Sequence, residues 1–394
     1  MTLSGARLHL GKSDLTLSGE LSGIRRAMLR GGKLKANFEL ESDLIDCNQL
    51  MLAIGKGLQF SDQLASNSVG AFSEDSISVL ETDHLLANTV DSVATDSISQ
   101  LFVVPKFLDL TLHTNAKKID FKDLKLEDVK GEVVIRDQSI NLSDLCMSSN
   151  IGSGDLTMVY TTKTDQEATM GFELSLNDIL VERLISLFPD IDTLVPMLRS
   201  FEGMVDCQMT ATCKADSTMS VLLPSVNASC YLSGKNMVLL DGETFTEISK
   251  TLMFKNKKRN MIDSIAVDLA IHDNKIEVFP FLVEMDRYKV AVGGTHNLDM
   301  TFDYHLSVLK SPVPFKLGID IKGNLDDFKF KIVKCKYKDF LKPTKQAELD
   351  STRRNVREEI RETIRKQIRE AAPELGNSLS EIHPHTHGHV EEST

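Results

Sequence analysis

Residues that could bind metal or act as nucleophiles are sparse in this chain. Four histidines alternate with other residues near the C-terminus, at His383, His385, His387 and His389. Alternating histidines can hold a metal loosely, but no carboxylate accompanies them to orient the imidazole rings. We therefore interpret residues 374–394 as a flexible His-rich tail, and the sequence predicts neither a metal site nor a cofactor.

The usual catalytic motifs are also missing from the sequence. The chain contains no Walker A sequence, HExxH, GxSxG or complete dinucleotide fingerprint, and its six cysteines form no CxxC pair. Cys207 and Cys213 would lie about 20 Å apart on one face of a strand, too far for a disulfide bond. Aspartate is common where turns are expected, as at Asp273. We expect no catalytic residues, and a protein that is not an enzyme.

A row of arginines forms the one dense group of charged side chains with regular spacing. Residues 341–373 predict a charged amphipathic helix with a narrow apolar stripe at Val356, Ile360, Ile364 and Ile368. A stripe this narrow indicates that the helix lies outside the hydrophobic core, either covering the end of a sheet or contacting a membrane or partner. The candidate contact residues are Arg353, Arg354, Arg357, Arg361, Arg365 and Arg369.

The composition of the chain excludes several classes of protein. The chain has 394 residues, 41% hydrophobic, which is enough for a core and excludes wholesale disorder. A net charge of −12 argues against a nucleic-acid-binding protein. No apolar run is long enough to span a bilayer as a helix, and the first residues do not form a signal peptide. We expect this chain to be part of a longer protein.

Most of the sequence alternates between apolar and polar residues with a period of two, which is typical of half-buried antiparallel strands. A turn is predicted at Asp273–Asn274, between two such strands. The apolar positions that share one parity on these strands should lie on one side of a sheet. They are Ile265, Val267, Leu269, Ile271, Met300, Phe302, Tyr304, Leu306, Phe315, Leu317 and Ile319.

The chain divides into five regions by composition. Residues 57–105 contain no Lys or Arg and are rich in Ser, Asp and Thr, so we expect a solvated insertion between two sheet segments. The predicted regions are a first sheet segment with a short helix (1–56), the acidic low-complexity insertion (57–105), the main β-region (106–340), the charged helix (341–373) and the tail (374–394).

Several short sequence segments, most of them predicted strands and turns, together resemble the C-terminal region of the AsmA-like family. The resemblance covers about residues 105–335 and, more loosely, 1–55. It consists of patterns of hydrophobicity, turns and glycines, without invariant catalytic residues. The segments that carry it are Leu187-Phe188-Pro189, Phe201-Glu202-Gly203, residues 232–239, residues 267–281, Gly293-Gly294, residues 297–304 and residues 318–330.

The resemblance implies a fold, a role and a location. The implied fold is mostly β: a long curved antiparallel sheet forming an apolar groove, with a few short helices and the charged C-terminal helix. The family is similar to TamB and to bridge-like lipid-transfer proteins, and its members are periplasmic proteins of the Gram-negative envelope, anchored in the inner membrane by an N-terminal helix. That helix is not part of this sequence. The implied role is outer-membrane biogenesis or phospholipid transport between the inner and outer membranes.

The strand pattern gives this role a mechanism. Helical segments are few beside the number of strands, so part of the apolar side of the sheet stays uncovered and is available to phospholipid or another acyl lipid. The parity-matched residues from Ile265 to Ile319 are then the candidate lipid-groove residues. The alternative is a β-rich structural or interaction scaffold whose core is closed by its own side chains and which carries no lipid.

Overall fold

The computed structural model describes residues 2–30, 32–53, 101–121, 124–149, 152–187, 201–240, 259–285, 288–297, 301–311, 316–324 and 327–371. Met300, Phe315, most of the acidic insertion and the His-rich tail lie outside the described residues.

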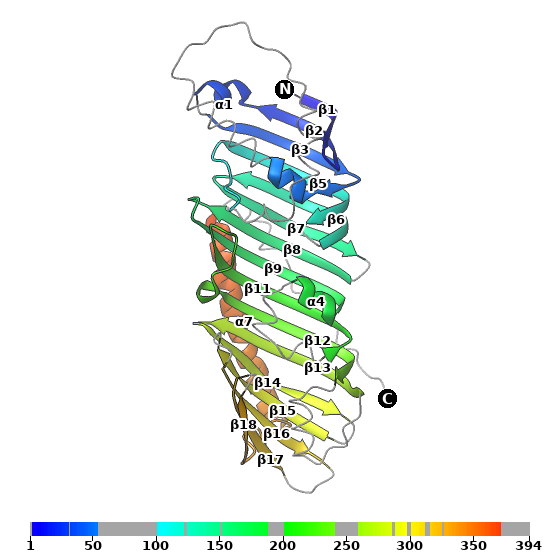
Figure 1. Ribbon diagram of the computed structural model, residues 1–394, viewed down its shortest axis with the longest axis vertical. Helices are drawn as coiled ribbons and strands as arrows, with labels where there is room; N and C mark the ends of the chain where they lie inside the picture. Colours follow the sequence, from blue (N-terminus) through cyan, green and yellow to red (C-terminus); the bar gives the residue numbers. More distant parts are fainter. Residues whose placement is uncertain are drawn as a thin grey trace.

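In the described part of the chain, eighteen strands make up one sheet that is not closed on itself. Their bounds are β1 (Thr2–Leu10), β2 (Ser13–Ser22), β3 (Leu34–Ser42), β4 (Ile45–Asp46), β5 (Leu108–Phe121), β6 (Leu124–Arg136), β7 (Ser139–Ser149), β8 (Gly152–Thr162), β9 (Glu167–Leu180), β10 (Phe201–Glu202), β11 (Met204–Asp216), β12 (Asn227–Leu240), β13 (Arg259–His272), β14 (Lys275–Met285), β15 (Tyr288–Asn297), β16 (Phe302–Lys310), β17 (Leu317–Gly323) and β18 (Phe328–Val333). Figure 1 shows them stacked along the long axis of the molecule, with β1 near one end and β17 and β18 at the other.

Nearly every strand pairs antiparallel with the next long strand in the chain, from β1 through to β18. Short turns make this possible, as at Asp273 and Asn274, whose φ angles of 50° and 60° suit a tight hairpin turn. The exceptions are β3 and β4, which both pair parallel to β5. The expected antiparallel sheet is therefore a mixed sheet at this one place.

Four helices accompany the sheet in the described part of the chain. They are α1 (Ile24–Arg30), a short helix over residues 47–53, α4 (Val181–Leu187) and the long α7 (Pro343–Ala371), with a 3-10 turn at Leu223–Ser225. The expected short helix near residue 50 and the charged C-terminal helix are thus present. Among the described helices, none combines the length and the apolar character needed to cross a membrane.

The strand register gives the sheet one apolar and one polar face. Cys207, Leu232 and Val267 lie directly across from one another on β11, β12 and β13, and the neighbouring positions Asp206, Ser233 and Ala266 form the next row. Because side chains alternate between faces, each row lies on the opposite side of the sheet from the next. We call the side of Leu232 the apolar face and the side of Ser233 the polar face.

Two helical segments lie on opposite sides of the sheet. Val181 and Leu184 of α4 belong to the hydrophobic cluster of the apolar face, together with Leu174, Val205 and Leu269. The long helix α7 instead runs along the polar face, across β8, β9, β11, β12 and β13. Figure 1 shows α4 in front of the sheet and α7 behind it.

Candidate functional site

The apolar face is the candidate functional site. Four of the predicted residues, Ile265, Val267, Leu269 and Ile271, follow one another along one side of β13 and belong to the larger hydrophobic cluster. Leu269 and Ile271 are buried, whereas Ile265 and Val267 are half-buried. The period-two pattern therefore identified the residues of one face on this strand.

A second cluster continues the apolar face over β15 to β18. Val290, Val308 and Ile321 are buried members of this cluster. Tyr304 packs against both clusters and so joins the two parts of the face. The other predicted residues in this cluster are Phe302, Leu306, Leu317 and Ile319. All nine described candidates therefore lie on one continuous side of the sheet.

Large apolar side chains on this face are exposed mainly near its two ends. Leu8 and Leu10 on the edge strand β1 are exposed, as is Ile332 on the edge strand β18. Leu317 and Phe302, one and two strands in from β18, are half-buried. These exposed side chains are more than scattered surface residues, because the register places Leu8 beside Leu15 and Ile332 beside Ile319, which belong to the apolar clusters.

Three segments of the chain cover parts of the apolar face. Cys47 and Leu50 of helix 47–53 pack against Leu40 and Ala116 near the β1 end. Farther along, Leu101 and Val104 are buried against Tyr160, and α4 covers the strands that follow. The burial of Leu101 and Val104 corrects the expected solvated insertion of residues 57–105 at its C-terminal end.

Hydrogen bonds join residues 101–104 to Tyr160, Thr162 and Ser217, which are distant in sequence. The Leu101 amide donates to the Ser217 carbonyl at 2.8 Å, and the Val104 amide donates to Thr162 Oγ1 at 2.8 Å. The Tyr160 hydroxyl donates to the Phe102 carbonyl, also at 2.8 Å. Burial raises the pKa of Tyr160 to about 12, so the hydroxyl stays protonated and able to donate well into alkaline pH.

The polar face holds α7 through the arginines that the sequence identified. Arg361 Nε and Arg365 Nε each lie 3.4 Å from Glu173 Oε1 on β9. Arg357 lies 3.8 Å from Asp268 Oδ1 on β13, with its guanidinium 5.3 Å from the centre of the Tyr231 ring.

The candidate arginines are thus divided between the sheet and solvent. Arg357, Arg361 and Arg365 face the sheet, and Arg354 is exposed. The side chains of Arg353 and Arg369, and those of Ile360, Ile364 and Ile368, lie outside the described residues. Leu349 of α7 joins a small cluster with Phe340 on the polar face, and no described side chain of α7 belongs to the larger hydrophobic cluster.

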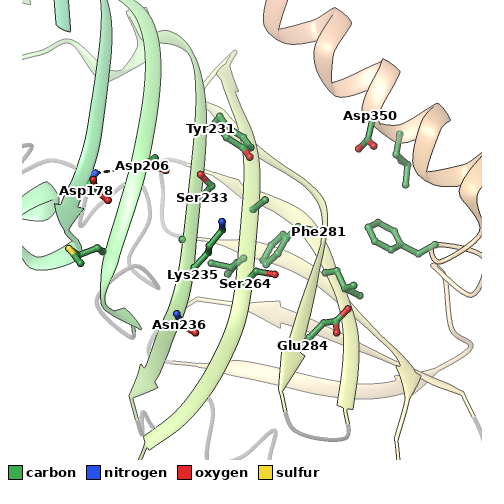
Figure 2. Close-up of a pocket in the computed structure, with 17 residues that line it drawn as sticks. Asp178, Asp206, Tyr231, Ser233, Lys235, Asn236, Ser264, Phe281, Glu284 and Asp350 are labelled. Atoms are coloured by element: carbon green, nitrogen blue, oxygen red, sulfur yellow. Dashed lines mark hydrogen bonds between the residues drawn. The ribbon is translucent and has the colours of Figure 1, made fainter. Parts of the chain in front are cut away.

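A hollow of about 870 Å³ lies beside α7 on the polar face (Figure 2). It opens where β13 and β14 diverge, since these strands pair only between Leu269–His272 and Lys275–Val278. Figure 2 shows Tyr231 and Ser233 on one wall and Phe281 and Glu284 on another, with Asp350 of α7 opposite. This lining is mixed: its charged residues are mainly acidic, and Ile265 and Phe281 of the larger hydrophobic cluster also reach it.

One polar cluster has the hydrogen-bond order of a nucleophilic triad. Asp320 Oδ1 lies 2.6 Å from His305 Nδ1, and His305 Nε2 lies 2.9 Å from Ser307 Oγ. The serine is fully buried, however, and its Oγ accepts the Tyr337 amide at 2.9 Å, while His305 Nε2 accepts the Lys336 amide at 3.1 Å. No substrate can approach Ser307 in this arrangement, which instead fastens residues 336 and 337 to β16.

The described cysteines are free thiols, of which three are buried, two are half-buried and one, Cys146, is exposed. Cys207 and Cys230 are buried in the larger cluster, and a hydrogen bond between them together with burial raises the pKa of Cys230 well above its usual value. A raised pKa disfavours the reactive thiolate. Within the described residues, no three His, Cys, Asp or Glu side chains gather in a way that would hold a metal ion.

Comparison of the chain with protein-family models, curated proteins and solved structures gives no match in any of the three. A proposal for the function therefore rests on the geometry of the apolar face.

Sequence reasoning missed the parts of the site that depend on contacts between distant segments. Nothing in Leu101–Val104 distinguishes it from the polar residues before it except a short apolar run. The pairing of Glu173 with arginines almost 190 residues later also leaves no local pattern. The lysine-rich stretch that begins at Lys316, in contrast, is a local pattern of the sequence.

Proposed function

We propose that the protein is a non-enzymatic carrier of acyl lipids, which bind along the apolar face of its sheet. The single observation that supports this most strongly is the continuity of that face. Leu15 on β2, Leu232 on β12 and Ile319 on β17 all belong to rows on the same side of one open sheet. The described helices cover only parts of it.

The chemistry of the face suits a lipid tail. Each methylene buried from water contributes about 0.8 kcal/mol, and no directional contact is required. Half-buried side chains such as Val267, Phe302 and Leu317 can contact a lipid chain without displacement of the fully buried side chains of the same face. The polar headgroup of the lipid would stay at the rim, in water.

The cellular role in this proposal rests on the resemblance to the AsmA-like family. On that basis the lipid is a phospholipid, and the protein contributes to outer-membrane biogenesis or to phospholipid transport between the inner and outer membranes. The proposed location is the periplasm.

Mass spectrometry of the protein purified without detergent tests the carriage of lipid. We expect co-purifying phospholipid in roughly stoichiometric amount. A crosslinkable phenylalanine analogue tests the face directly when it is placed at Phe302 or, as a control, at the adjacent Asp303. Phe302 lies on the apolar face and Asp303 is exposed on the polar face.

We expect lipid to crosslink at position 302 and not at position 303. Equal crosslinking at both positions, or protein that is free of lipid and crosslinks at neither, would contradict the proposal. The second result would favour the alternative, a scaffold whose clusters are satisfied by their own side chains. Burial of residues such as Leu174 and Ile179 within the larger cluster is the observation behind that alternative.

A further inference from the structure

The end of the sheet that carries β17 and β18 is strongly basic in an otherwise acidic protein. Between Lys316 and Lys345 the sequence has nine lysines, four aspartates, and no glutamate or arginine, whereas the whole chain has a net charge of −12. Figure 1 shows β17 and β18 at the end of the molecule opposite β1. Positive charge is therefore concentrated at one end of the sheet.

Most of these lysines are free to meet a ligand. Among the described residues, ion pairs engage Lys322 with Asp303 at 2.6 Å, Lys342 with Asp339 at 2.8 Å, and Lys345 with Glu348. The others are exposed and have no ion-pair partner within the described part of the chain. We call these six the lysine tip: Lys316, Lys329, Lys331, Lys334, Lys336 and Lys338.

The arrangement of the lysines brings like charges together. Lys329 on the edge strand β18 lies directly opposite Lys322 on β17, whose charge is offset by Asp303, whereas Lys329 has no ion-pair partner in the described part of the chain. Lys322, Lys334 and Lys336 also line one hollow of about 500 Å³, together with Asp303 and Asp320. Lys316 Nζ donates to the Lys338 carbonyl at 3.3 Å.

Two exposed apolar side chains accompany the lysines. Ile332 is 67% exposed on β18, on the same side of the strand as Phe328 and Phe330, and Leu341 is 41% exposed just before α7. Because side chains alternate along a strand, Lys329 and Lys331 lie on the opposite side of β18 from Phe328, Phe330 and Ile332, so this edge has a charged side and an apolar side. Charged and apolar side chains at one edge are typical of surfaces that rest on membranes, where the charges meet anionic headgroups and the apolar side chains enter the interface.

We propose that the lysine tip docks the β18 end of the sheet on a membrane surface that contains anionic phospholipid. The functional role of this docking rests on the proposed lipid carriage. Docking at this end places the end of the apolar face, with Phe328, Phe330 and Ile332, beside the bilayer. Three arginines of α7 do not provide this contact, because their side chains are engaged with the polar face. They are Arg357, Arg361 and Arg365.

Lysines on an edge strand can also serve another purpose. They prevent two exposed strand edges from pairing between molecules, and any strong charge achieves this. Charge reversal separates the two roles, since glutamates would still block edge pairing but would repel an anionic membrane.

Vesicle sedimentation with the full chain tests the proposal. The probes are vesicles of phosphatidylcholine alone and of phosphatidylcholine mixed with phosphatidylglycerol, at low and high salt. The test variant carries Lys329→Glu, Lys331→Glu, Lys334→Glu and Lys338→Glu. A control variant with the same net charge carries four substitutions at exposed lysines elsewhere: Lys118→Glu, Lys125→Glu, Lys130→Glu and Lys235→Glu.

We expect the wild type to bind the anionic vesicles and not the neutral ones, with binding weakened by salt. The test variant should bind the anionic vesicles about tenfold more weakly or worse, because each lysine near such a surface contributes several-fold to affinity. The control variant should retain most of its binding. Gel filtration of both variants should show monodisperse protein, as expected if edge blocking survives.

Three results would overturn the inference: no binding of the wild type to anionic vesicles, an equal loss in test and control variants, or unchanged binding of the test variant. The experiments can contradict membrane docking without contradicting lipid carriage, and the reverse. A wild type that binds anionic vesicles but contains no co-purifying phospholipid would uphold the docking surface and contradict lipid carriage. A test variant that retains co-purifying phospholipid but no longer binds the anionic vesicles would support both membrane docking and lipid carriage.

Discussion

The Tyr160 hydroxyl donates a 2.8 Å hydrogen bond to the backbone carbonyl of Phe102, 58 residues earlier in the chain. This bond holds residues 101–104 against the apolar face, beside the bond from the Val104 amide to Thr162 Oγ1. The segment thus occupies part of the surface that we propose for lipid.

Substituting Tyr160→Phe tests how firmly this segment is held. The change keeps the ring in the cluster but leaves the Phe102 carbonyl without its donor, so we expect a loss of about 1–3 kcal/mol in the free energy of unfolding. Hydrogen exchange at the Leu101 and Val104 amides should accelerate. Thr169→Val, at an exposed position on β9, serves as the control and should change neither quantity. Unchanged exchange at Val104 in Tyr160→Phe would show that packing alone holds the segment.

Stability should fall in alkaline solution because buried phenols must ionise on unfolding. Burial raises the pKa of Tyr160 and of Tyr304 to about 12, from an ordinary value of 10.0. The folded state therefore retains protons that the unfolded state loses, and the stability that these groups contribute is complete below about pH 10 and lost between about pH 10 and pH 12.

Urea unfolding at a series of alkaline pH values measures this effect. The double variant Tyr160→Phe and Tyr304→Phe should show a shallower decline in the free energy of unfolding than the wild type over the same range. Parallel curves for the two proteins would indicate that other groups, such as the buried thiols, cause the alkaline loss.

Two isoleucines that face each other across β17 and β18 provide a matched test of the apolar face. Ile319 is completely buried, whereas its direct partner Ile332 is 67% exposed on the edge strand. Ile319→Ala should lower the free energy of unfolding by about 2–5 kcal/mol, since it removes buried methylenes and leaves a cavity. Ile332→Ala should cost about 0.5 kcal/mol or less. Similar costs at both positions would mean that β18 is covered by something in solution.

The attachment of α7 depends on one carboxylate that meets two arginines. Glu173→Gln removes the charge that Arg361 and Arg365 approach, and these guanidinium groups are largely withdrawn from water. We expect faster hydrogen exchange along α7 and a loss of about 1–3 kcal/mol. Glu41→Gln, at an exposed position on β3, is the control. Undisturbed exchange in α7 would show that Leu349 and Phe340 suffice to hold the helix.

The sequence predicted the features of the fold that repeat locally. Alternation along Ile265–Ile271 assigns these residues to one face, because the side-chain period of a strand is two. The turn at Asp273–Asn274 follows from residues that tolerate positive φ. With short turns between successive strands, such local rules specify most of an antiparallel sheet.

The remaining features depend on contacts that a local pattern does not contain. The narrow apolar stripe of α7 indicated a helix outside the core, but the position of Glu173 that attracts its arginines is set by the stacking of strands. The same holds for Leu101, whose burial requires Tyr160 and Ala168 to lie together on the apolar face. The parallel pairing of β3 with β5 is likewise set by the path of the chain between them.

That parallel pairing has a consequence for the order of folding. From β5 to β18 almost every strand can add to its predecessor by closing a short loop, so this part can assemble step by step from any hairpin. Joining β3 to β5 instead requires closure of the long connection from β4 to Leu108, at a larger entropic cost and before any contact compensates for it. We therefore expect β1–β4 to join the sheet last and to leave it first, so that the end opposite the lysine tip opens before the rest of the molecule.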